Sequence, residues 1–281
     1  MKTFGHRLAS FIGLLAASAA VATPAMADDD LMAKIKATKR LEAIVGQSPA
    51  WSTVDAAGQA DGIMPDIVRA FLKRAGIEAT VHPIVMPFDS IIPALLSDKA
   101  DLAANSMFIT PARAKQILFT NVLFYNSEAL FIAKGNPLGI KSLAGLCGHT
   151  GATYKGTVWV SILEKASKEC PAGKSIDIRL YATSDLVLQD IIAGRVDGGL
   201  VDQYAGLYTL SKDPNLKFEI APGYVSPNRA ANGAAIPINP KYKSFATTFN
   251  KVYAELLANG TIKGLFEARG FKPAEVFLRP E

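Results

Sequence analysis

The segment from residue 105 to residue 113 has the composition of an anion-binding site. Its sequence is Asn-Ser-Met-Phe-Ile-Thr-Pro-Ala-Arg. Thr110 is favourable as the N-cap of a helix, and Pro111 is favourable in the first turn. Free backbone N–H groups and the positive end of the helix dipole attract anions there. Arg113 can add a two-pronged contact to a carboxylate. Because a cation in the first turn opposes the dipole, either a bound anion or a neighbouring aspartate must explain Arg113.

Two further polar positions follow expected strands. Asp202 ends the apolar run Gly198–Val201, and its carboxylate can hold an ammonium group or cap the segment that follows. Gly156 and Thr157 come after another expected strand, where an N–H and a hydroxyl can meet a carboxylate. A plain turn is the alternative for this pair.

Aromatic residues near these positions can wall a small pocket. Trp51 lies in a loop after a strand, and Phe88 directly precedes a helix. Such rings stack on cations, although core packing is the alternative for both. Trp159 lies on an amphipathic helical pattern, so we expect it in the core.

Signatures of catalysis are weak. The run Gly46–Ala50 lacks the last glycine of a nucleophile elbow, and Gly151–Thr157 lacks the lysine of a phosphate loop. After the N-terminal region the histidines are His82 and His149, and Cys147-x-His149 is not a known zinc-ligand spacing. We therefore expect no metal ion, no cofactor and no enzymatic activity.

The charge balance disfavours nucleic acid as a partner. The 281 residues include 30 Lys+Arg and 25 Asp+Glu, and 49% of them are hydrophobic. Residues 1–27 hold Lys2 and Arg7 but no acid, so the rest is only slightly basic. No block of lysine or arginine occurs, as a nucleic-acid surface would need.

The N-terminus has the pattern of a secretory signal peptide. A basic start is followed by the apolar stretch Leu8–Ala22 and by Ala25-Met26-Ala27, which predicts cleavage after Ala27. The apolar stretch is shorter than the roughly 20 residues that span a membrane. We therefore expect residues 1–27 to be removed and the remainder to be exported to the periplasm.

Export decides how the two cysteines are interpreted. Cys147 and Cys170 are the only pair, and exported proteins fold in an oxidising compartment. A disulfide between them would contribute about 3 kcal/mol in the chain-entropy account. Two free thiols or a metal site are the alternatives.

Strand and helix patterns alternate along the chain, which predicts an α/β fold. Expected strands cover residues 41–45, 80–85, 101–104, 129–133, 176–180, 196–201, 218–220 and 234–238. Expected helices cover residues 64–76, 90–96, 159–169, 184–193, 205–210, 245–260 and 261–269.

One stretch occurs twice. Residues 94–101 and 190–197 share a helix end, a turn and an Asp that enters an apolar strand, at an offset of 96. The same offset pairs Ser106 with Asp202, each just past its strand. Two similar lobes facing one crevice would produce this, and chance similarity is the alternative. Asp101 and Asp197 fall at the opposite strand ends, so we interpret both as structural.

Over residues 39–271 the chain resembles the bacterial extracellular solute-binding proteins, family 3, which serve ABC importers of polar amino acids. The segments that carry the resemblance are Gly62–Ile67, Phe88–Leu95, Ser106–Arg113, Lys134–Pro137, Gly156-Thr157 and Gly194–Asp197. Each is weak alone, but their order and spacing behind a signal peptide are specific.

The resemblance implies a two-lobed α/β fold of the type II periplasmic binding protein kind, closing about two hinge strands. Lobe one would comprise residues 39–131 and 226–281, and lobe two residues 136–222. Each lobe would be a sheet flanked by helices, and the ligand would lie in the cleft between the lobes.

The resemblance also implies roles for individual residues. Arg113 would bind an α-carboxylate and Asp202 an α-ammonium group, with polar contacts from Ser106, Phe108 and Thr157. Aromatic walls would come from Phe88 and, less directly, from Trp51.

The sequence departs from the family pattern in three places. An acid is missing before Asp66, and Phe108 and Val158 replace small hydroxyl residues, which disfavours a basic amino acid. Residues 64–66 and 107–113 resemble binders of compatible solutes such as ectoine.

The implied protein is a monomeric receptor for a small zwitterion, either an amino acid or an ectoine-like compound. It would deliver this ligand to an ABC permease in the inner membrane. The alternative is a prephenate- or arogenate-dehydratase-like enzyme on the same fold, with Glu128 as candidate general acid.

Overall fold

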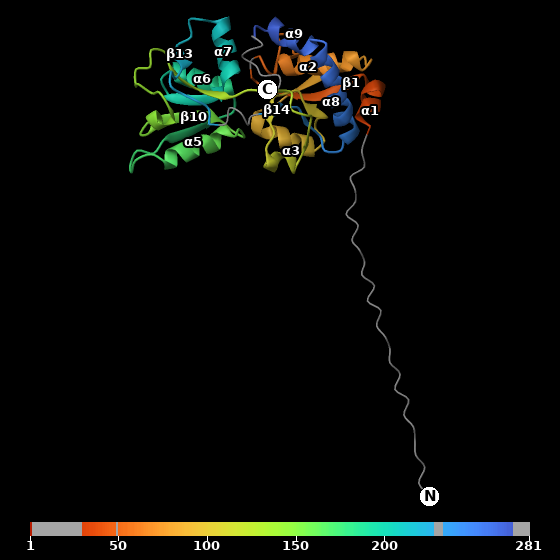
Figure 1. Ribbon diagram of the computed structural model, residues 1–281, viewed down its shortest axis with the longest axis horizontal. Coiled ribbons are helices and arrows are strands. Elements are labelled where there is room, and N and C mark those ends of the chain that lie inside the picture. The colour runs from red at the N-terminus through yellow and green to blue at the C-terminus, as the bar shows by residue number, and fades with distance from the viewer. Residues whose placement is uncertain (2–29, 49, 228–232, 272–281) are drawn as a thin grey trace.

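Two lobes lie side by side in the computed structural model, which describes residue 1 and residues 30–48, 50–227 and 233–271 (Figure 1). Each lobe has a five-stranded sheet with helices against it, so the expected two-lobed α/β fold is confirmed. Apart from Met1, the expected signal peptide lies outside the described residues. In the described part, no helix has both the length and the apolar character needed to cross a bilayer.

The first lobe is built on a mixed sheet with three parallel strands at one side. Its strand order is β4 (Thr80–Val85), β1 (Arg40–Val45), β5 (Leu102–Ala103), β15 (Pro237–Ile238) and β7 (Leu118–Phe119). The helices of this lobe are α1 (Leu31–Thr38), α2 (Ile63–Arg74), α3 (Ile91–Leu96), α8 (Lys243–Ala258) and α9 (Thr261–Ala268). Strand β1 runs parallel to both neighbours, whereas β15 is antiparallel to β5 and β7.

The second lobe repeats this plan. Its strand order is β11 (Asp177–Tyr181), β10 (Thr150–Tyr154), β12 (Gly198–Asp202), β9 (Glu128–Ala133) and β13 (Phe218–Ile220). Its helices are the short η2 (Leu143–Leu146), α5 (Trp159–Lys168), α6 (Ser184–Ile192) and α7 (Gln203–Lys212). Strand β10 is parallel to β11 and β12, and β9 is antiparallel to β12 and β13.

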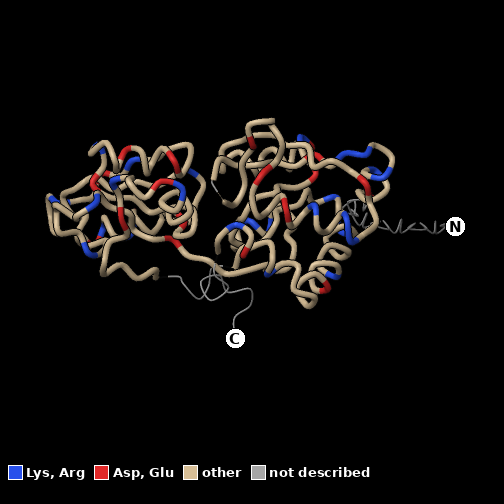
Figure 2. Tube along the Cα trace, turned by 90° about the horizontal axis from the view of Figure 1, so that it is seen from above, with Lys and Arg blue, Asp and Glu red and all other residues tan. Residues whose placement is uncertain are grey.

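Smaller elements connect the lobes or lie at their edges. A three-stranded sheet has the order β6 (Met107–Phe108), β14 (Gly233–Ala235) and β8 (Phe124–Tyr125). The remaining elements are the hairpin β2 (Thr53–Val54) and β3 (Ala60–Asp61) and the short helices η1 (Phe88–Ser90) and α4 (Pro111–Ala114). Seen from above, the lobes meet at a narrow waist, and acidic and basic residues are interspersed on both (Figure 2).

Strand β9 lies in the second sheet. The sequence placed residues up to 131 in lobe one, but residues 128–133 pair with β12 and β13. An apolar strand pattern does not reveal which sheet the strand joins, because the partner strands are distant in sequence. The other lobe limits, 136–222 and 226–281, stay predictions.

The repeated stretch has the same contacts in both lobes. The Asp101 carboxylate accepts from the Glu42 N–H at 3.1 Å, and the Asp197 carboxylate accepts from the Thr150 N–H at 2.8 Å. Each aspartate thus joins the start of its own strand to the neighbouring parallel strand. These contacts agree with the interpretation of Asp101 and Asp197 as structural residues, because both lie at the strand ends away from the other lobe.

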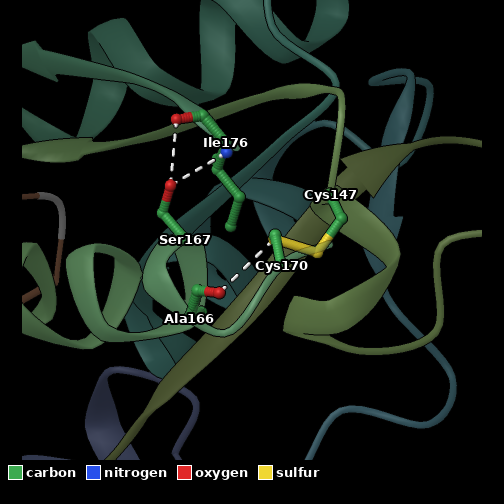
Figure 3. Close-up of a disulfide and its surroundings, with 5 residues drawn as sticks. All are labelled: Cys147, Ala166, Ser167, Cys170 and Ile176. Carbon is green, nitrogen blue, oxygen red and sulfur yellow. Dashed lines mark hydrogen bonds between the residues drawn. A yellow bond between two sulfur atoms is a disulfide. The ribbon is translucent and has the colours of Figure 1, made fainter. Parts of the chain in front are cut away.

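The disulfide fixes one helix of the second lobe. Cys147 and Cys170 are bonded, with Cα atoms 5.5 Å apart (Figure 3). Cys147 directly follows η2, and only Glu169 separates Cys170 from the end of α5. Nearby, the Ser167 hydroxyl accepts from the Ile176 N–H at 2.9 Å. These links fix the C-terminal end of α5. The first residue of this helix is Trp159.

Two helical glycines give a matched test of packing. A Cβ on Gly206 in α7 would overlap the ring of Phe131, which is fully buried and packs edge-on against Phe218 at 5.6 Å. A Cβ on Gly264 in α9 would meet nothing within 4 Å. We expect Gly264→Ala to raise the free energy of unfolding by about 0.5–1 kcal/mol through reduced chain entropy.

Gly206→Ala should instead lower the free energy of unfolding by about 1–3 kcal/mol, because the ring cannot move without disrupting the core. Urea unfolding followed by circular dichroism measures both variants. Equal stabilisation by the two substitutions would contradict the packing of α7 against β9.

Candidate functional site

A cavity between the lobes collects all seven residues that the sequence nominated. It encloses about 630 Å³, including the part open to solvent. Arg113, Ser106, Phe108, Phe88 and Trp51 line it from the first lobe, and Thr157 and Asp202 line it from the second. The parallel strands explain this convergence, because their carboxyl ends all face the crevice.

Arg113 is a buried cation without an acidic partner among the described residues. Thr110 caps α4, and its hydroxyl accepts from the Arg113 N–H at 3.3 Å, as the sequence predicted. The guanidinium donates to the carbonyls of Phe108 at 2.7 Å and Gly156 at 2.9 Å. It also lies 5.5 Å from the centre of the Phe88 ring. Burial lowers the pKa of Arg113 to about 10, so it stays charged at neutral pH.

Asp202 is the buried carboxylate of the site. It ends β12 and caps α7, with Oδ1 accepting from the N–H groups of Tyr204 and Ala205 at 3.0 Å. Oδ1 also accepts from Trp51 Nε1 at 2.8 Å, and Oδ2 accepts from the side-chain amide of Asn126. Burial raises the pKa of Asp202 to about 6, although these hydrogen bonds favour the charged form. Asp202 therefore caps α7, which was one of the two interpretations from sequence, and it also lines the cavity.

Trp51 combines packing with a polar contact. Its ring stacks on Phe124 with centroids 4.8 Å apart and an angle of 2° between the planes. Only 2% of the residue is exposed, so core packing describes most of its surface. Its indole N–H reaches Asp202 in the other lobe, and the residue still lines the cavity.

A second group of rings forms the opposite wall. Tyr154, the last residue of β10, packs edge-on against Phe88 at 5.9 Å and Trp159 at 5.3 Å. Trp159 also packs edge-on against Phe108 at 6.2 Å. Trp159 was expected in the core, and it is only 3% exposed, yet it lines the cavity. Tyr154 was missed because an aromatic residue inside a strand pattern reads as ordinary core.

Thr157 and Ser106 contribute in different ways. The Thr157 hydroxyl donates to the Tyr154 carbonyl at 2.9 Å, so it must turn to donate to a ligand carboxylate. Ser106 lies between β5 and β6, is partly buried and lines the cavity. Both are therefore available to a ligand that enters between the lobes.

Asn126 is a site residue that sequence reasoning missed. It lies between β8 and β9, where the chain passes from one lobe to the other, and it is 5% exposed. Its Nδ2 donates to Asp202, while its Oδ1 is buried and accepts no hydrogen bond from any described residue. No local sequence pattern marks such a residue, because its role depends on the neighbouring lobe.

The cleft is closed in this conformation. Two hydrogen bonds cross it, from Arg113 to the Gly156 carbonyl and from Trp51 to Asp202. Gly156, at φ +80°, lies so close to Asp89 that a Cβ would stand 2.8 Å from the Asp89 Cα. The lobes therefore touch on both sides of the cavity.

The charges of the lining are balanced. Among the described lining residues, Arg113 and Asp202 are the only ones that carry a charge at neutral pH. Glu128, the candidate general acid, is 1% exposed, accepts from the Tyr224 hydroxyl at 2.7 Å and does not line the cavity. Within the described ranges, no group of three or more His, Cys, Asp or Glu side chains could hold a metal ion.

The raised pKa of Asp202 leads to a pH-dependent prediction. A carboxyl group whose pKa rises on folding stabilises the protein when protonated, and this stability is lost as pH rises through the folded pKa. Asp202→Asn removes that titration. We expect the free energy of unfolding of the variant, relative to the native protein, to rise by about 3 kcal/mol between pH 4 and pH 7.

Urea unfolding of both proteins at several pH values measures this difference. Asp185, whose pKa burial also raises to about 6, titrates in both proteins and cancels. A difference that does not change with pH would contradict a raised pKa at Asp202.

Comparisons with known proteins agree on one family. A sequence model of the bacterial extracellular solute-binding proteins, family 3, matches residues 42–268. The lysine/arginine/ornithine-binding periplasmic protein of Escherichia coli (strain K12) is 30% identical over 220 residues, which cover 75% of this chain and 79% of that protein. An arginine-binding extracellular protein of Bacillus subtilis (strain 168) is 31% identical over 208 residues, covering 73% and 75%.

Solved structures give the same result. An ancestral arginine-binding protein bound to arginine has a TM-score of 0.73 at 26% identity, covering 83% of this chain and 99% of that chain. The solute receptor for L-cysteine of Neisseria gonorrhoeae has a TM-score of 0.74 at 20% identity, covering 87% and 98%, which supports the fold alone. With the match over residues 42–268, the chain belongs to the bacterial extracellular solute-binding proteins, family 3.

Proposed function

We propose that the protein is the periplasmic receptor of an ABC importer and binds an amino acid or a similar zwitterion between its lobes. The observation that carries this is the pair of buried, opposite charges, Arg113 and Asp202, which line one cavity from different lobes. A molecule with a carboxylate at one end and a cationic group at the other complements both.

The carboxylate of the ligand would bind Arg113. The guanidinium now donates to two neutral carbonyls, of Phe108 and Gly156. A carboxylate is a stronger acceptor, and its charge compensates the burial that lowers the pKa of Arg113. Ser106 and the hydroxyl of Thr157 would add polar contacts at the same end of the ligand.

The ammonium group would bind Asp202 and Asn126. Oδ1 of Asp202 already accepts three hydrogen bonds, whereas Oδ2 accepts one. Oδ2 and the unpartnered Oδ1 of Asn126 together offer two acceptors to a group with three donors. A bound cation also favours the ionised form of Asp202, so binding should lower its pKa.

The family and its named relatives support export and transport. The E. coli and B. subtilis relatives are named for binding basic amino acids, in the periplasm or outside the cell. We propose cleavage after Ala27, release of a monomer into the periplasm, and delivery of the ligand to a permease in the inner membrane. Ligand that bridges the lobes would favour the closed conformation.

Loss of the guanidinium should abolish binding. Arg113→Ala removes the cation that would pair with the ligand carboxylate, and such a loss weakens binding by about 30-fold or more. Titration calorimetry on refolded, ligand-free protein against a panel of L-amino acids and ectoine measures it. Lys115→Ala, an exposed change at the end of the same helix, should leave affinity unchanged. Binding by Arg113→Ala within about threefold of the native protein would refute the assignment.

Closure itself can be tested with two glycines. Gly156→Ala places a Cβ against the Asp89 backbone and should hold the lobes apart, lowering ligand affinity by about tenfold or more. Gly194→Ala has a similar positive φ, +67°, but meets nothing within 4 Å. It should therefore cost stability without changing affinity.

Calorimetry gives the two affinities, and small-angle X-ray scattering with saturating ligand gives the radius of gyration. We expect a larger radius for Gly156→Ala only. Equal affinities for the two variants would argue against closure about this contact.

A further inference from the structure

Two buried polar groups at the cavity can still pair with a ligand. The indole Nε1 of Trp159 is inaccessible and makes no hydrogen bond to any described residue, whereas the Ser184 hydroxyl, also inaccessible, lies within hydrogen-bond reach of the Asp185 carboxylate and accepts no hydrogen bond from the described residues. The two residues are 3% and 2% exposed, and both line the cavity. Leaving such groups unsatisfied costs free energy, so a ligand atom that pairs with them is favoured.

The topology brings these two residues to one place. Trp159 begins α5, which follows β10, and Ser184 begins α6, which follows β11. Strands β10 and β11 are parallel neighbours, with Tyr154 opposite Tyr181 at their ends. The starts of the two helices therefore lie at the same edge of the second sheet, on the cavity side. We call this place, formed by Trp159 and Ser184, the recess.

The surroundings of the recess are aromatic. The Trp159 ring packs against Tyr154 and Phe108, at centroid distances of 5.3 and 6.2 Å. Val158, partly buried, precedes Trp159 and also lines the cavity. A side chain entering here would contact apolar surface along its length and meet polar groups only at its end.

The charges of the cleft disfavour a cationic side chain. Asp202 is the only acid among the described lining residues, and an α-ammonium group would occupy it. The Phe88 ring, which could attract a cation, already faces Arg113. Asp185 follows Ser184 and interacts with its hydroxyl, but it does not line the cavity. A second positive charge would therefore be enclosed without an acid in the described lining to pair with, which is costly.

Resting on the proposed function, we propose that the recess of Trp159 and Ser184 selects ligands by their side chain. The preferred ligand is an amino acid whose uncharged side chain ends in a hydrogen-bond acceptor, such as a carboxamide. Trp159 Nε1 donates to this acceptor, and Ser184 Oγ, whose proton is directed toward Asp185, accepts from the amide NH2 of the same group. The preference differs from the basic amino acids after which several relatives are named.

L-Glutamine and L-methionine provide a matched pair of probes, because they are similar in length and only glutamine carries an amide. Calorimetry on refolded, ligand-free protein should give glutamine about tenfold higher affinity than methionine, and about hundredfold higher affinity than L-arginine. Ectoine, which has no side chain of this kind, should bind more weakly than glutamine.

Trp159→Phe keeps an aromatic ring but removes the donor together with part of the indole, and methionine binding reports the effect of the lost volume. The substitution should weaken glutamine binding by about tenfold and leave methionine binding within about threefold of the native value. Ser184→Ala should show the same selectivity if the tryptophan variant folds poorly. Ser161→Ala, an exposed change on α5 outside the recess, should alter neither affinity.

Several outcomes would overturn this inference while the proposed function stands. They are tightest binding of arginine, lysine or ectoine, equal binding of glutamine and methionine, or equal losses for both ligands in Trp159→Phe. Loss of arginine binding in Asp185→Asn would identify a cation site instead. If no zwitterion bound the native protein, the proposed function would fail and this inference with it.

Discussion

The properties of this molecule depend on two buried charges of opposite sign, which lie in different lobes and are not paired with each other. Burial lowers the pKa of Arg113 and raises the pKa of Asp202, so removal from water disfavours the charged form of both groups. Neutral dipoles compensate them only in part: two carbonyls for the arginine, and an indole, an amide and two backbone N–H groups for the aspartate. A zwitterion of matching length would compensate both at once, which is the physical basis of the proposed function.

The fold places these charges by repeating one lobe plan. In both sheets three parallel strands are followed by an antiparallel fourth strand. The carboxyl ends of the parallel strands face the cleft, so the segment after β5 leads to Arg113 while β12 ends at Asp202. At the other ends, Asp101 and Asp197 tie neighbouring strands together in the same way. In the second sheet, the structural Asp197 and the cavity-lining Asp202 thus lie at opposite ends of the same strand.

The same groups that face the cavity also hold the lobes together. Arg113 donates across the cleft to Gly156, and Trp51 donates across it to Asp202. Contacts between the lobes themselves therefore contribute to the closed conformation, and the proposed ligand would exchange these contacts for stronger ones to itself. The affinity depends on this difference, because a ligand shifts the equilibrium only by its preference for the closed state.

The sequence alone determined what depends on neighbours along the chain. The strands at 80–85 and 218–220 have the predicted limits, and Thr110 caps its helix as its side chain and the following proline require. The residues nominated for the site share one cavity, because strand ends are visible in the sequence and parallel sheets gather them at one edge. The pairing of Cys147 with Cys170 also needed only their number and the compartment.

Tertiary structure decided whatever depends on residues far apart in the chain. Strand β9 pairs with β12 and β13 of the second sheet. Because these partners lie about 70 to 90 residues further on, the local sequence could not show the pairing. Asn126 acquired its role from Asp202, and Trp159 at the start of α5 packs against Phe108 of the other lobe. Periodicity reports which side of an element is apolar, but burial against the core and burial against a ligand give the same pattern.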